Sequence, residues 1–133
     1  MKDRTGIILY CEEQKRLLLI RRRFKEKEHW IVPSGSVHSG ESYEDAAKRK
    51  AMKELNIYIQ AMMDFCTINI GRHIEKYFIS YLDSCIILKM HGELNLSSRE
   101  NIYEPVWAYA EKLPFTPLYP QYLKDKLIEI SQK

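Results

Sequence analysis

The chain has 133 residues, of which 45% are hydrophobic and 29% charged, a mixture typical of one globular domain that buries its own core. Lys and Arg total 21 against 18 Asp and Glu, and the formal charge of +3 is too small to indicate nucleic acid as a partner. No apolar run approaches the roughly 20 residues of a membrane-spanning helix. We therefore expect a single domain over residues 1–133, with neither a membrane nor a nucleic acid as partner.

The three cysteines, Cys11, Cys66 and Cys85, stand alone in apolar segments, and none has a second cysteine or a histidine at a zinc-binding spacing. Buried free thiols are the ordinary state of such residues. An odd cysteine count without a leader segment favours a reducing compartment, so we expect a cytoplasmic protein.

Strands are predicted first along the chain. Residues 6–10 and 16–22 are β-rich runs joined by a polar connection, a pattern that predicts a hairpin. Residues 30–32 form a third short apolar run, which ends at the turn signal Pro33-Ser34-Gly35.

A helix is predicted over residues 42–55. Ser42, followed by Asp45 three residues later, resembles a capping box at its start. A narrow apolar stripe follows at helical spacing, made of Ala47, Ala51 and Leu55. Such small residues let a helix lie close against a sheet. Asn56 comes directly after the helix, where a left-handed residue is expected and asparagine is the best substitute for glycine.

The second half of the chain predicts further strands and one more helix. The strands are expected at residues 62–70, 76–82, 84–90 and 105–109, with a polar loop at 91–101. The last helix is expected over residues 119–131, where apolar residues recur at helical spacing. The natural architecture for this order is an α/β fold with a central mixed β-sheet flanked by helices.

One segment, residues 30–57, carries a specific motif. It reads WIVPSGSVHSGESYEDAAKRKAMKELNI and resembles the Nudix box, a strand–loop–helix with the pattern Gly-x5-Glu-x7-Arg-Glu-U-x-Glu-Glu-x-Gly-U, where U is aliphatic. The matching positions are Gly35, Glu41, Arg49, Glu54 and Ile57, with Ala51 at the first aliphatic place. The preceding Leu-Leu-Leu-Ile-Arg-Arg run and a late Glu-Lys-Leu-Pro extend the resemblance over nearly the whole chain.

The resemblance implies a Nudix-type α/β/α sandwich and a ligand that contains a diphosphate. In active members three helix glutamates hold Mg²⁺ or Mn²⁺, which neutralises the phosphates and activates a water molecule. Their positions, 50, 53 and 54 in this chain, share one helix face because they are three and four residues apart. The resemblance makes Gly35 and Gly40 turn residues of the loop, and it makes Arg49 an organiser that pairs with loop carboxylates.

The chain departs from the pattern at two of these three glutamates. Lys50 and Lys53 replace them, and only Glu54 remains. A single ammonium about 5 Å from a divalent cation repels it by roughly 7 kcal/mol at an effective dielectric near 20. Lysine also offers no oxygen ligand to a hard cation. We therefore expect metal-dependent hydrolysis to be impaired or lost.

Binding without hydrolysis is the first function that the sequence leaves open. Lys50 and Lys53 would contact the phosphates of a nucleoside diphosphate-linked compound directly, and Arg21 or Arg23 would add further contacts. Both replacements are basic rather than neutral, which favours this interpretation. The sequence does not select among diphosphate compounds.

Two alternatives stay open beside it. An active hydrolase would need a rebuilt Mg²⁺ or Mn²⁺ site, with Glu41 and Glu54 as ligands and with Glu54, Glu100 or Glu104 as catalytic carboxylates. A structural or protein-interaction domain, for instance a homodimer, is the third function, because tyrosine occurs nine times and is enriched at interfaces.

Overall fold

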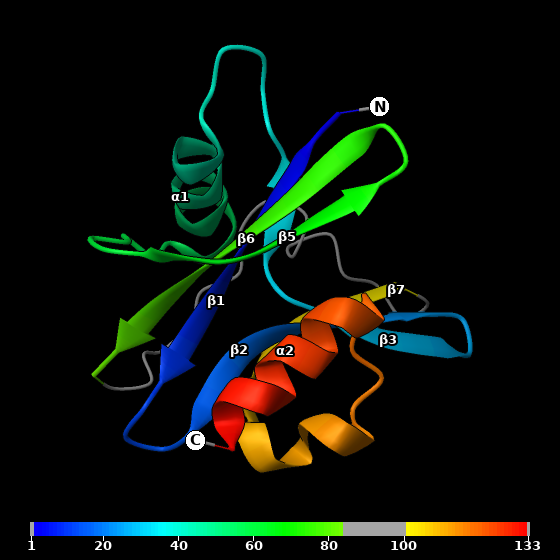
Figure 1. The fold of residues 1–133 in the computed structure, drawn as a ribbon. Helices are drawn as coiled ribbons and strands as arrows, with labels where there is room; N and C mark the ends of the chain where they lie inside the picture. The colour runs from blue at the N-terminus through cyan, green and yellow to red at the C-terminus, as the bar shows by residue number, and fades with distance from the viewer. Residues whose placement is uncertain (1, 84–100, 133) are drawn as a thin grey trace.

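The computed structural model describes residues 2–83 and 101–132. Its strands are β1 (Arg4–Cys11), β2 (Arg16–Phe24), β3 (Lys27–Ile31), β4 (Ser34–Ser36), β5 (Met63–Ile70), β6 (His73–Leu82) and β7 (Asn101–Tyr109). Its helices are α1 (Tyr43–Leu55), the 3-10 helix η2 (Ala110–Phe115) and α2 (Gln121–Ser131). Figure 1 shows α1 on one side of the strands and α2 with η2 on the other.

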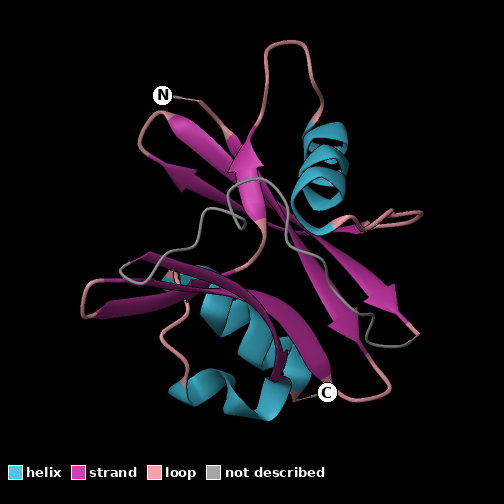
Figure 2. Cartoon of the chain, turned by 180° about the vertical axis from the view of Figure 1, so that it is seen from behind, coloured by secondary structure: helices cyan, strands magenta, loops and turns pink. Residues whose placement is uncertain are grey.

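A mixed sheet forms the centre of the molecule, with the strand order β3-β2-β1-β6-β5. β1 and β6 run parallel, whereas β4 pairs antiparallel with β1 and β7 pairs antiparallel with the whole of β2. β1 and β2 pair with each other only at Tyr10 with Leu17 and at Cys11 with Arg16. The two halves of the sheet therefore diverge from one shared end, as the views from both sides show (Figures 1 and 2).

Both faces of β1 and β2 are buried, which explains why their apolar residues run on without polar alternation. The side chains that pack with α1 include Ile7, Leu9, Leu18 and Ile20. Those that pack with η2 and α2 include Ile8, Leu17 and Leu19. Successive strand residues point to opposite faces, so the same two strands contribute to both cores. The predicted α/β/α sandwich is confirmed.

Both ends of α1 form as the sequence predicts. At the start the Ser42 side chain accepts a hydrogen bond from the Asp45 backbone N–H at 3.0 Å. At the end Asn56 adopts the left-handed conformation, with φ 57° and ψ 39°. The Asn56 N–H donates to the Met52 carbonyl at 3.0 Å. The helix that carries the lysines is thus fixed at both ends by local contacts.

Several boundaries differ from the sequence prediction. β3 begins at Lys27 and ends before Val32, and β7 begins at Asn101, inside the segment predicted as a loop. The longer β7 was not predicted because it contains Pro105, and proline lacks the N–H that a strand ladder needs. Pro105 lies on β7 and pairs with Ile20 of β2. Among the described strands, β2 is the neighbour of β7. The strand predicted at 84–90 and the loop before Asn101 lie outside the described residues. No helix within the described ranges is long and apolar enough to cross a membrane.

Candidate functional site

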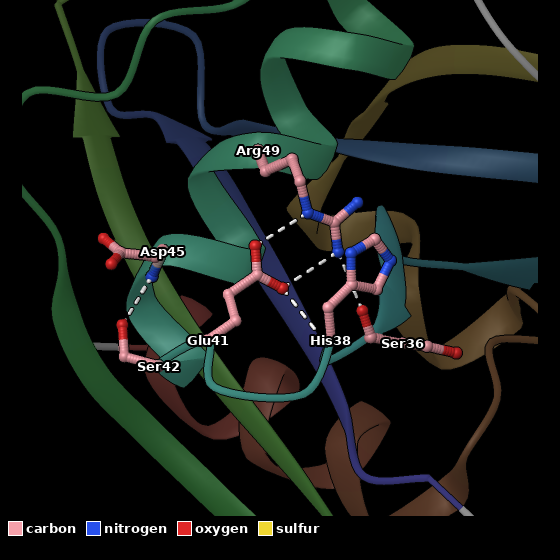
Figure 3. A network of polar contacts seen from close by, with 6 residues as sticks. All are labelled: Ser36, His38, Glu41, Ser42, Asp45 and Arg49. Carbon is pink, nitrogen blue, oxygen red and sulfur yellow. Dashed lines mark hydrogen bonds and ion pairs between the residues drawn. The ribbon is translucent and has the colours of Figure 1, made fainter.

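A clamp formed by Arg49 holds the loop in front of α1 (Figure 3). Its Nε donates to Glu41 Oε2 at 2.8 Å, and its Nη2 donates to Glu41 Oε1 at 3.2 Å and to the Ser36 carbonyl at 2.9 Å. The His38 backbone N–H also donates to Glu41 Oε1, at 3.0 Å. The Arg49 hydrogen bond and then the His38 amide lower the pKa of Glu41 to about 2. Glu41 is therefore an ionised structural partner of Arg49, the organising role that the resemblance implies for this arginine.

Lys50 lies next to the only one of the three motif glutamates that remains. Its ammonium Nζ is 3.2 Å from Glu54 Oε1, and the side chains of Lys50 and Glu54 are only 16% and 13% exposed. The aliphatic stem of Lys50 runs against Gly35 in β4. A Cβ atom added at Gly35 would lie 2.4 Å from Lys50 Cε and 2.7 Å from Cδ, so a larger residue there would displace the stem.

A cavity of about 490 Å³ opens in front of α1, and we call it the basic cavity. Its walls are Arg4, Arg22, Ser34, Gly35, Ser36, His38, Arg49, Lys50, Lys53 and Tyr103. Five of these residues are arginines or lysines, and none of the described wall residues is a carboxylate. An anionic ligand would therefore find several cationic groups and no described repelling charge at this wall.

The walls of the basic cavity come from distant parts of the chain. Arg4 belongs to β1, Arg22 to β2 and Tyr103 to β7, and α1 supplies the remaining cations. The Arg22 guanidinium carbon lies 4.8 Å from the centre of the Tyr103 ring. Its Nε is buried and has no hydrogen-bond partner among the described residues. This buried atom is closed to a ligand, so the rest of the guanidinium, which lines the cavity, is the part that can meet an anion.

Two smaller cavities adjoin the basic cavity. One, of about 50 Å³, is mostly apolar and shares Ser34, Lys50 and Tyr103 with it. Glu54 lines this apolar cavity. The other, of about 220 Å³, shares Arg4, Arg22 and Ser34 with the basic cavity and reaches Tyr119. The three cavities therefore lie side by side and share Ser34 as a common wall residue.

The structure places Lys50 and Lys53 in this wall, but not Arg21 or Arg23. Arg21 binds Glu28 and, at 3.0 Å, Glu104 Oε2, and these hydrogen bonds raise its pKa. Arg23 is exposed and is not among the residues that line the basic cavity. Arg22, between them, points to the opposite face of β2 and lines the cavity.

Arg4, Arg22 and Tyr103 line the cavity but are not among the site residues predicted from the sequence. Strand alternation was the one signal that could have found Arg22. Ile20 shares the α1 face with Leu18, so the next residue on that face is Arg22. Arg4 and Tyr103 carry no comparable local signal, because only the sheet brings them beside α1.

Among the described residues, the carboxylates that were predicted to rebuild a metal site do not come together. Glu104 follows Tyr103 on β7, so its side chain points to the opposite face of the sheet, where it binds Arg21. Glu41 is engaged by Arg49, and Glu54 by Lys50. Glu100 lies outside the described residues.

The described residues do not fit the Mg²⁺ or Mn²⁺ site that the resemblance implies. Across residues 2–83 and 101–132, no three His, Cys, Asp or Glu side chains form a group able to hold a metal ion. Two of the three expected ligand positions carry ammonium groups, which offer no oxygen to a hard cation. The cationic character of this face is instead suited to an anion.

Solved structures share this fold at low sequence identity. A MutT from a study of the Aliivibrio salmonicida and Vibrio cholerae proteins aligns over 96% of this chain and 97% of its own, with 17% identity and a TM-score of 0.74. A Caenorhabditis elegans Ap4A hydrolase aligns over 98% and 96%, with 20% identity and a TM-score of 0.71. The NUDIX domain of Shewanella oneidensis NrtR, complexed with ADP ribose, aligns over 97% and 87%, with 16% identity and a TM-score of 0.71.

The sequence itself gives the decisive comparison. No curated protein matches the chain. The family model of the NUDIX domain, however, matches residues 1–124, almost the full length of the sequence. The fold, the Arg49 clamp and this match agree, and the chain belongs to the Nudix family.

Proposed function

We propose that this protein binds a nucleoside diphosphate-linked compound through its phosphates, without metal-dependent hydrolysis. The observation that carries the proposal is the convergence of five cationic side chains on the basic cavity, with no carboxylate among its described walls. Lys50 and Lys53 belong to that set and stand where hydrolytic members of the family have glutamates.

The physical basis is direct neutralisation of phosphate charge. Arginine presents a planar fork that matches two phosphate oxygens, and lysine contributes a mobile point charge with three donors. Arg22 supplies the first kind of contact and Lys50 and Lys53 the second, while Arg49 stays bound to Glu41 and Ser36. Such contacts strengthen in a partly closed cavity, because the effective dielectric there is lower than in water.

Loss of hydrolysis follows from the same charges. The reaction needs a cation that activates water and holds the diphosphate. Ammonium groups at positions 50 and 53 repel a divalent cation from that place. The protein would then keep the ligand-binding part of the Nudix scaffold while its chemistry is suppressed.

Binding in metal-free buffer is the first test. We expect the wild type to bind ADP ribose, the ligand of the similar NrtR domain, in isothermal titration with EDTA present. The Lys50→Glu/Lys53→Glu variant should bind at least about tenfold more weakly, since each tenfold corresponds to only about 1.4 kcal/mol. The control is Lys48→Glu, which makes the same charge change at an exposed position of α1 outside the cavity. Equal affinity of the wild type and the double variant would show that the two lysines do not contribute to ligand binding.

Hydrolysis is tested on a mixed panel of nucleoside di- and triphosphates, sugar nucleotides and dinucleotides with Mg²⁺ or Mn²⁺. We expect no turnover by the wild type and turnover by Lys50→Glu/Lys53→Glu, because the variant restores the carboxylates of the motif. Turnover by the wild type would contradict the proposal. It would favour a rebuilt metal site, with Glu54→Gln and Glu100→Gln as the next variants to assay.

A further inference from the structure

The Lys50 side chain is largely buried and is held by its neighbours. Its side chain is 16% exposed, its ammonium lies 3.2 Å from Glu54 Oε1, and it borders both the basic cavity and the apolar cavity. Glu54 borders the apolar cavity but not the basic one. An ammonium has three N–H donors, and the contact with Glu54 takes one of them. The remaining donors are available to an anion that enters the basic cavity.

Gly35 determines where the stem of Lys50 can run. A Cβ atom at this position would lie 2.4, 2.7 and 2.9 Å from Lys50 Cε, Cδ and Cγ, so the contact involves most of the stem and not only its flexible tip. Gly35 is itself buried and is paired with Thr5 of β1, so the β4 backbone cannot easily retreat. The ammonium is therefore held in place before any ligand arrives, which lowers the entropic cost of binding.

Resting on the function proposed above, we propose that the Lys50 ammonium neutralises phosphate charge in place of a divalent metal ion. The protein then binds the metal-free form of a diphosphate ligand more tightly than its magnesium complex. Gly35 positions the lysine and Glu54 pairs with it until phosphate oxygens arrive. A diphosphate that already carries Mg²⁺ brings two positive charges toward a wall of five cationic side chains, of which, among the described residues, only Arg49 and Lys50 have a carboxylate partner, Glu41 and Glu54. Magnesium should thus weaken binding here, whereas a glutamate-lined metal site requires it.

The sign of the magnesium effect is the primary measurement. Pyrophosphate is titrated into the wild type with EDTA, and then with rising MgCl₂ at constant ionic strength. We expect the affinity to fall about tenfold or more as magnesium saturates the ligand. In Lys50→Glu/Lys53→Glu the effect should reverse, with magnesium improving binding. An unchanged or increased affinity of the wild type in magnesium would overturn the inference.

The same titration separates this inference from the proposed function. If the wild type does not bind pyrophosphate in EDTA, or binds it equally well after Lys53→Glu, phosphate recognition by the basic cavity is itself wrong. If binding depends on Lys53 but tightens with magnesium, phosphate recognition stands and the selection of the metal-free ligand fails.

A double-mutant cycle tests the role of Gly35 as a positioning residue. Gly35→Ala should weaken pyrophosphate binding in EDTA and reduce the magnesium effect. In a Lys50→Ala background the stem is absent, so Gly35→Ala should then change little. Equal losses in both backgrounds would show that Gly35 acts on the loop rather than through Lys50.

A second variant keeps the inference testable if Gly35→Ala does not fold. Lys50→Met retains an unbranched stem of similar length against Gly35 and removes only the charge. Its magnesium effect should be much smaller than that of the wild type. A magnesium effect of full size in Lys50→Met would overturn the assignment to Lys50.

Discussion

At the scale of single residues, the same motif contains two ion pairs with different consequences. Arg49 and Glu41 tie the loop to α1, and Glu41 also accepts the His38 amide. Lys50 and Glu54 lie one helical turn apart and face the cavities. The first pair keeps the loop in place, and the second holds a positive charge at the ligand wall. The lysine at position 50 therefore alters the charge of the ligand wall, while the clamp that holds the loop is kept.

The Glu41 ion pair predicts a specific acid sensitivity. The pKa of Glu41 is lowered from 4.5 to about 2, so its contribution to the free energy of unfolding is fully present above pH 4.5 and is lost as the pH falls toward about 2. Glu41→Gln should therefore be less stable than the wild type above pH 4.5. This difference in the free energy of unfolding should shrink as the pH falls from 4.5 to about 2. Urea unfolding midpoints at several pH values measure it.

A matched control for this prediction is Glu44→Gln, which removes one carboxylate at an exposed position in the first turn of α1. Arg49 binds Glu41 and not Glu44, so Glu44→Gln should lower the free energy of unfolding at pH 7 by less than Glu41→Gln does. A difference between wild type and Glu41→Gln that stays constant down to about pH 2 would contradict the assigned role of the carboxylate.

At the scale of elements, α1 determines the direction of every cationic side chain that it contributes. Its small residues Ala47 and Ala51 are buried against the sheet, and this close approach places the lysine face over the loop. The helix begins at the Ser42 cap and is followed by the left-handed Asn56. Its register relative to the loop is thus set by contacts at both ends and by packing on one face.

The end of α1 gives a stability prediction. Asn56 is exposed and has φ 57°, a conformation that glycine adopts freely and that alanine adopts at a cost of roughly 1–2 kcal/mol. Asn56→Ala should lower the free energy of unfolding by about 1 kcal/mol, and Asn56→Gly should leave it nearly unchanged. Urea denaturation of both variants measures this, and equal stabilities would contradict the conformational argument.

At the scale of the whole molecule, the basic cavity exists because the sheet is forked. β1 and β2 pair at one end only, and their diverging ends bring Arg4 and Arg22 to the same space. α1 closes this space from one side with its lysines, and β7 adds Tyr103. No single element contains the site, because β4 and the following loop also supply wall residues, so the cavity depends on the packing of all these elements.

Arg22 gives a prediction at this scale. Arg22→Ala should weaken pyrophosphate binding in EDTA by about tenfold, since a hydrogen bond to a charged group contributes roughly 1.5–3 kcal/mol. Arg23→Ala, the neighbouring residue on the exposed side of β2, should bind like the wild type. Isothermal titration measures both, and equal losses would mean that general charge, rather than the cavity, attracts the ligand.

The elements around the motif could be predicted from the sequence because their signals are local. A cap residue, a stripe of small side chains and a left-handed asparagine fix α1 within a few residues of one another. Burial on both faces makes the strands read as continuous apolar runs. The resemblance also implied that Arg49 pairs with loop carboxylates, and the structure shows that Glu41 is the carboxylate it binds.

The ligand wall could not be predicted in this way. Three consecutive arginines look alike in the sequence, and only the orientation of β2 in the sheet makes Arg22 face the cavity and Arg21 face Glu104. Glu104 was predicted as a catalytic carboxylate, but its position on β7 directs it to the opposite face of the sheet, where it binds Arg21. The sequence by itself determined the family, the α/β/α sandwich and the reversed charges on α1, because these depend on short-range pattern. Only the tertiary structure decided which charges share one space, because their meeting depends on strand pairing between residues far apart in the chain.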